Sequence, residues 1–88
     1  MNEIWAVELL LAECDQRYGQ GRYGAALRAS EAAREAAEAL DDMGLMVRAM
    51  VAEASVHQML GDHRRALARY TEVLTLAEDP QHASIFAS

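Results

Sequence analysis

The fold is decided by a stretch that occurs twice, first as Gly21-Arg22-Tyr23-Gly24-Ala25-Ala26-Leu27 and then, 40 residues later, as Gly61-Asp62-His63-Arg64-Arg65-Ala66-Leu67. The glycine and the Ala-Leu pair recur at one spacing. Two Ala-Glu pairs recur at the same spacing, Ala12-Glu13 as Ala52-Glu53 and Ala37-Glu38 as Ala77-Glu78. Because the matches share one offset without a gap, we expect two similar units in series. A period of this size is typical of stacked helical hairpins, each too small to bury its apolar face alone.

The composition favours helices throughout. The chain has 88 residues, of which 52% are hydrophobic and 25% are charged, with one proline and five glycines. Alanine, leucine, glutamate, arginine and methionine dominate, and these are the strongest helix formers. We therefore expect an all-α fold in a single domain, residues 1–88.

Apolar periodicity and turn residues predict four helices. They should run from about residue 2 or 3 to 18, from 23 to 40, from 43 to 60 and from 63 to 78. Gly19-Gln20-Gly21 ends the first helix, either Asp41 or Asp42 caps the third, and Asp62 caps the fourth. Asp79-Pro80 resembles the start of another helix. Short connections make neighbouring helices antiparallel, which gives a first hairpin at 1–40, a second at 41–78, and a partial or capping helix at 79–88.

The periodicity also predicts which side chains face the core. In the second helix the inner stripe is alanine, and the outer, solvated face carries Arg28, Glu31, Arg34, Glu35 and Glu38. In the third helix Met43, Met46 and Met50 are expected in the core, and Met59 is expected to be exposed. In the fourth helix the inward residues should be Ala66, Leu67, Tyr70, Val73, Leu74 and Ala77.

The two units resemble the tetratricopeptide repeat (TPR). Its pattern has a small residue in the first helix of the hairpin, a glycine seven residues later followed by an aromatic, and an alanine and then an aromatic in the second helix. Ser30 in the first unit and His63 in the second replace one aromatic each. Cys14, Gly21, Tyr23, Ala26 and Ala33 match it in the first unit, and Ala54, Gly61, Ala66, Tyr70 and Pro80 match it in the second. Glu13 and Glu53 depart from the pattern, since leucine is expected at both. The long period is similar to that of long TPRs in bacterial regulators. The resemblance implies hairpins stacked as a right-handed α-solenoid; an ordinary four-helix bundle is the alternative.

TPR proteins bind peptides on the concave face formed by the first helices of successive hairpins, so the resemblance implies a non-catalytic interaction module that docks a peptide or protein segment. The exposed residues expected at the groove are Glu8, Leu11, Asp15, Tyr18, Arg48, Val51, Ser55, Gln58 and Met59. Only Arg48 among them is basic, so a basic or amphipathic segment fits better than a free carboxylate. A solvated face without a partner is the alternative.

A second hypothesis concerns the two ends of the repeat array. A helical array needs about three units or polar end caps for stability, whereas this chain has two units and apolar residues at both ends. We therefore expect either that the sequence is a piece of a longer array or that it forms a homo-oligomer, with contacts at Trp5, Ile85 and Phe86. The sequence would also fit a self-assembly module of a larger bacterial regulatory protein, or an effector-sensing helical domain.

Catalytic and metal chemistry find little support in the sequence. His57 and His63 lie on either side of a turn, at a spacing unsuited to two metal ligands on one helical face. Cys14 aligns with Ala54, a position that requires a small side chain, so a buried, inert thiol is expected. The glycines near residue 20 follow a predicted helix and not a strand, so the sequence lacks the context of a phosphate-binding loop. We expect no catalytic residue, no metal and no cofactor.

Charge and cysteine content indicate the compartment and the excluded partners. The net charge is −6, which opposes binding to nucleic acid, and a single cysteine suits a reducing compartment. No apolar stretch is long enough to cross a membrane. A cytoplasmic location is expected.

Overall fold

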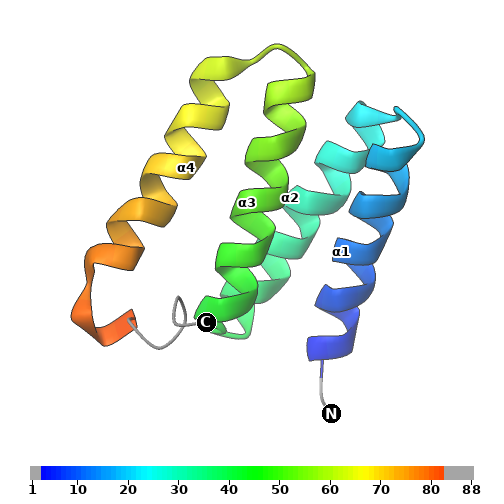
Figure 1. The fold of residues 1–88 in the computed structure, drawn as a ribbon. Helices are drawn as coiled ribbons and strands as arrows, with labels where there is room; N and C mark the ends of the chain where they lie inside the picture. Colours follow the sequence, from blue (N-terminus) through cyan, green and yellow to red (C-terminus); the bar gives the residue numbers. More distant parts are fainter. Residues whose placement is uncertain (1–2, 83–88) are drawn as a thin grey trace.

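The computed structural model describes residues 3–82, and these form four α-helices and one short 3-10 helix. The α-helices are α1 (Ile4–Gly19), α2 (Tyr23–Ala39), α3 (Met43–Met59) and α4 (His63–Glu78), and the 3-10 helix η1 is Pro80–His82. Figure 1 shows antiparallel neighbours, with α1 and α4 at opposite ends. The predicted all-α fold and the four helices are confirmed, and each helix boundary lies within about two residues of its predicted position.

The same backbone geometry turns the chain in both hairpins. Gly21 and Gly61 have φ angles of 75° and 80°, in the left-handed region that glycine adopts without strain. The next residue donates its N–H to the fifth carbonyl before it: Arg22 to Arg17 at 2.8 Å, and Asp62 to His57 at 2.8 Å. This closes each first helix with a Schellman-type cap and explains why the turn glycine recurs.

Aspartates organise the starts of α3 and α4. Asp42 accepts a hydrogen bond from the Leu45 N–H at 3.1 Å, and Asp62 accepts one from the Arg65 N–H at 3.2 Å. Asp41 takes the left-handed position of the α2–α3 turn, with φ of 54°. Of the two aspartates predicted as alternative caps, Asp42 is therefore the cap and Asp41 forms the turn.

The helices pack mainly on their neighbours in sequence. Each helix packs on the next, and α1 also contacts α3, whereas α4 packs on α3 rather than on α1. The hairpins are therefore stacked in series and do not close into a ring of four helices. The molecule measures 36 × 34 × 22 Å, and its thin dimension corresponds to two helix diameters.

The apolar core lies where α1, α2 and α3 meet. One cluster comprises Val7, Leu11, Ala33, Ala37, Leu45 and Ala49, and a second comprises Cys14, Ala26, Ala29 and Val56. The alanines of α2 let α1 and α3 approach it closely from two sides. As predicted, Met50 is buried, Met46 packs on the first cluster and Met59 is exposed.

The prediction for α4 is wrong in part. Leu67 and Leu74 were expected to face inward but are 67% and 63% exposed, and Ala66 is the only residue of α4 that is fully buried. One neighbouring helix covers only part of the apolar stripe, because α4 lies at the end of the stack.

The predicted helix at 79–88 is only partly described. Asp79 accepts a hydrogen bond from the Gln81 N–H at 2.9 Å and so starts a single turn, η1, at the expected Pro80. Ile85 and Phe86, predicted as oligomer contacts, lie outside the described residues. Between residues 3 and 82, no helix is both long and apolar enough to span a membrane.

Candidate functional site

An open groove runs between α1 and α3 and is the main candidate site. Its volume is about 520 Å³. The side chains that line it are Leu11, Cys14, Asp15 and Tyr18 from α1, and Val47, Arg48, Val51, Ala52 and Ser55 from α3. Six of the nine residues predicted for the groove are therefore brought together there: Leu11, Asp15, Tyr18, Arg48, Val51 and Ser55.

The groove has an apolar floor and a polar rim. Leu11 and Cys14 are almost fully buried and belong to the core clusters, so they form the floor; Leu11 was expected to be exposed, and that expectation is wrong. Val51, 39% exposed, adds an accessible apolar contact. Asp15 and Arg48 are exposed at the rim and come from different helices.

The rim charges have no ionic partner among the described residues. The ion pairs of this part of the chain lie elsewhere, and neither Asp15 nor Arg48 takes part in one. An unpaired negative charge and an unpaired positive charge thus border the groove, and both are available to a partner molecule.

Tyr18 is held in place at the groove by a second aromatic ring. It packs edge to face on Tyr23 of α2, with ring centroids 5.5 Å apart and an interplanar angle of 70°. This geometry is the favoured one for aromatic pairs and restricts the ring of Tyr18.

Three residues predicted for the groove do not line it. Gln58 is directed to α4, where its Oε1 accepts a hydrogen bond from the Tyr70 hydroxyl at 3.0 Å. Glu8 and Met59 are exposed but lie outside the groove. Helical spacing placed all three on one side of their helices, but it could not give the width of the groove or the partner that Gln58 finds on α4.

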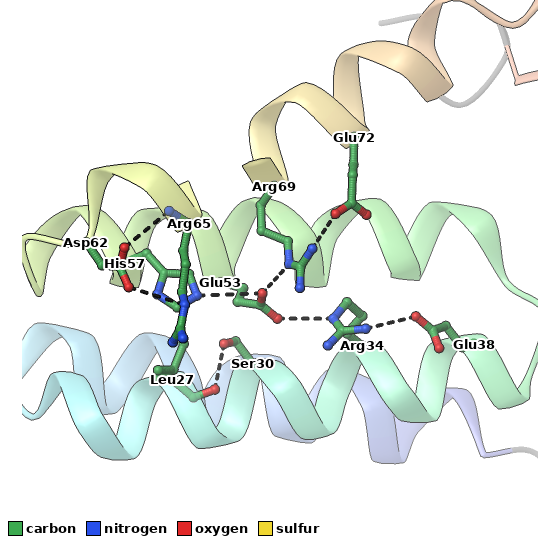
Figure 2. A network of polar contacts seen from close by, with 10 residues as sticks. All are labelled: Leu27, Ser30, Arg34, Glu38, Glu53, His57, Asp62, Arg65, Arg69 and Glu72. Carbon is green, nitrogen blue, oxygen red and sulfur yellow. Dashed lines mark hydrogen bonds and ion pairs between the residues drawn. The ribbon is translucent and has the colours of Figure 1, made fainter. Parts of the chain in front are cut away.

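A second feature, which the sequence analysis missed, is a buried ionic network between α2, α3 and α4 (Figure 2). Glu53 of α3 is 1% exposed and accepts hydrogen bonds from Arg34 of α2, at 3.1 Å, and from Arg69 of α4. Arg34 also bonds Glu38 at 3.0 Å, and Arg69 also bonds Glu72. The buried side chain of His57 lies 3.7 Å from Glu53.

The two arginines determine the protonation state of Glu53. Burial by itself opposes ionisation, but the hydrogen bonds from Arg69 and Arg34 outweigh it and hold the pKa of Glu53 below its ordinary value. The carboxylate is thus charged, fully bonded and inaccessible. It links three helices and has no free position for a substrate.

The prediction that Arg34 belongs to a solvated face is wrong, because Arg34 is partly buried against Glu53. The available signal was the glutamate at 53, where the repeat pattern expects leucine. A charge in a core position requires a buried partner.

Cys14 has the environment of a structural thiol. It is 2% exposed and packs with Ala26, Ala29 and Val56. Burial, with a smaller contribution from the charge of Asp15, raises the pKa of the Cys14 thiol. The thiolate that a nucleophile or metal ligand requires is therefore disfavoured.

The remaining titratable residues do not form an obvious reactive site. His57 is buried on α3, and His63 is exposed at the first position of α4. Within residues 3–82 no three His, Cys, Asp or Glu side chains are grouped so that they could hold a metal ion.

Comparison with known proteins adds no family assignment: no protein family, curated protein or solved structure matches the chain.

Proposed function

We propose that the chain is a non-catalytic protein-interaction module, similar to a TPR adaptor, that binds a peptide or protein segment in the groove between α1 and α3. The observation that carries the proposal is the unpaired pair of opposite charges, Asp15 and Arg48, on the rim of an open groove with an apolar floor.

The chemistry of the groove suits an amphipathic segment. Apolar side chains of the segment would contact Leu11 and Val51, and its charged groups would pair with Asp15 and Arg48. The hydroxyl of Tyr18 adds hydrogen-bonding capacity at the lining, whereas that of Ser55 already lies 3.3 Å from the Tyr70 hydroxyl of α4, within hydrogen-bonding distance. A pocket that is mostly apolar with a few placed polar groups is a common form of recognition site. The proposal extends to the setting of the module: it is cytoplasmic, and it forms part of a bacterial regulatory protein.

Charge reversal at the rim tests the proposal. The double variant Asp15→Arg with Arg48→Glu keeps the net charge and changes only exposed side chains. Proteins captured from lysate by the original chain, and then purified, should bind this variant at least about tenfold more weakly in calorimetry, because rim charges would oppose their partners.

A matched control removes the effect of surface charge in general. Arg28→Glu with Glu35→Arg makes the same exchange on the exposed face of α2, away from the groove. This variant should retain full affinity. If the groove variant binds every purified partner as tightly as the control does, the groove is not the binding site.

A further inference from the structure

The two ends of the helix stack each present an uncovered apolar surface. On the outer side of α1, Trp5 and Leu9 are 63% and 61% exposed and lie one helical turn apart, with exposed Ala12 following on the same side. On α4, Leu67 and Leu74 lie two turns apart and are equally exposed. We call the first set the α1 face (Trp5, Leu9, Ala12) and the second the α4 face (Leu67, Leu74).

The internal repeat shows what covers such residues elsewhere in the molecule. Forty positions after Trp5 and Leu9 stand Leu45 and Ala49, which are buried in the core cluster that α3 shares with α2. The α1 face is thus equivalent to the side of α3 that packs on α2.

The α4 face has its equivalent on the other side of the same junction. Forty positions before Leu67 stands Leu27, which packs on the cluster containing Val56 of α3. Forty positions before Leu74 stands Arg34, which bonds Glu53 of α3. The two exposed end faces are therefore equivalent to the two surfaces that meet at the α2–α3 junction.

We propose that the α4 face of one copy of this chain packs on the α1 face of a second copy, so that the copies stack head to tail and repeat the α2–α3 junction between molecules. The occupant of each face is then already specified, because each copy carries both complementary surfaces.

Charge supports this pairing over a pairing of like faces. Residues of α1 comprise three acids, Glu8, Glu13 and Asp15, and one arginine, Arg17, a balance of −2. Residues of α4 comprise three arginines, Arg64, Arg65 and Arg69, and two acids, Glu72 and Glu78, and Arg69 is already paired with Glu53 of α3. Two α1 faces would repel each other through their negative charge, whereas α4 has no excess of acids that would repel α1.

The geometry predicts the kind of assembly. A contact between two different faces leaves one of each free at the ends, so it grows into an open chain or closes into a ring instead of stopping at a symmetric dimer. Mass should therefore rise with concentration beyond the dimer.

Two blocked variants test the pairing. Trp5→Glu with Leu9→Glu blocks the α1 face, and Leu67→Glu with Leu74→Glu blocks the α4 face. At hundreds of micromolar in sedimentation equilibrium, each variant alone should be a monomer. An equimolar mixture should form a one-to-one dimer and nothing larger, since each variant keeps one intact face.

Val51→Glu is the control, because it places a glutamate on an exposed apolar residue of the groove, outside both end faces. It should assemble as the original chain does. The proposal is overturned if the original chain stays monomeric at these concentrations, if either blocked variant still self-associates, or if the mixture contains only monomers.

A measurement on the original chain does not depend on the folding of variants. On dilution from hundreds of micromolar, the backbone amide signals of α1 near Leu9 and of α4 near Leu67 should shift together in NMR spectra, with one common dissociation constant. Shifts confined to one of the two faces would show a symmetric contact and contradict the head-to-tail arrangement.

Discussion

Glu13 and Glu53 stand at equivalent positions of the two hairpins and have opposite environments. Glu13 is exposed on α1, whereas Glu53 is buried on α3 and bound by Arg34 and Arg69. The difference extends to the whole hairpins. α1 buries Val7, Leu11 and Cys14, and α2 buries five small side chains, whereas α4 buries only Ala66 completely.

The position of a helix in the stack, rather than the repeat sequence, decides whether a residue on it is buried and paired or exposed to solvent. α3 lies between α2 and α4, so a glutamate on it is covered from two sides and each neighbour supplies an arginine (Figure 2). α1 lies at an end, so the equivalent glutamate remains in water. A buried carboxylate needs such partners, because desolvation of an unpaired charge is costly.

The largest effect is expected from removing Glu53. Glu53→Ala leaves the guanidinium groups of Arg34 and Arg69 partly buried without their shared anion, and should lower the free energy of unfolding by about 3 kcal/mol. Glu13→Ala, the equivalent change, should alter it by less than about 0.5 kcal/mol. Urea denaturation followed by circular dichroism measures both. Equal losses would mean that the ionic network does not stabilise the second hairpin.

A somewhat smaller effect is expected from enlarging equivalent alanines. Ala37 is fully buried between α1, α2 and α3, so Ala37→Leu should destabilise the chain by about 2 kcal/mol through overpacking.

The equivalent Ala77 on α4 is only half-buried, so Ala77→Leu should cost less than about 1 kcal/mol. Thermal unfolding of the two variants compares the packing of the hairpins directly. A larger loss for Ala77→Leu than for Ala37→Leu would show that α4 is packed as tightly as α2.

The smallest effect is expected from protonating Glu53, because the neutral acid keeps its volume and can still accept hydrogen bonds. The pKa of Glu53 in the folded chain lies below its ordinary value, so its contribution is complete above the ordinary glutamate pKa of about 4.3. That contribution is lost as the pH falls through this value towards the lowered one.

Glu53→Gln should therefore flatten the loss of stability below about pH 4.3. Unfolding free energies of the original chain and of this variant, measured between neutral and acidic pH, give the two slopes. A Glu53→Gln chain with the same acid dependence as the original would show that other carboxylates account for it.

The groove could be predicted in large part because the TPR resemblance indicates the two helices that would form it. It placed Leu11, Asp15 and Tyr18 of the first helix and Arg48, Val51 and Ser55 of the third at one groove, and the structure brings both sets together. Gln58 was misplaced because its hydrogen-bond partner, Tyr70, belongs to another helix.

The ionic network could not be predicted in the same way. Arg34 lies on a face of α2 that is rich in charge, and periodicity assigns such a face to solvent. Whether a third helix passes over that face is not a local property. Leu67 and Leu74 were misjudged for the opposite reason, since their stripe is apolar but only part of it has a neighbour.

The sequence by itself determined the helices, their turns and their order. Gly21 and Gly61 supply the left-handed turn residues, Asp42 and Asp62 cap the following helices, and the 40-residue period makes the hairpins similar. The tertiary structure alone decided that Glu53 is buried between two arginines while Glu13 is exposed, and that Gln58 bonds Tyr70 of α4 and does not line the groove. The physical reason is that capping and turn preferences act within a few residues, whereas burial and ion pairing depend on which helices lie beside each other.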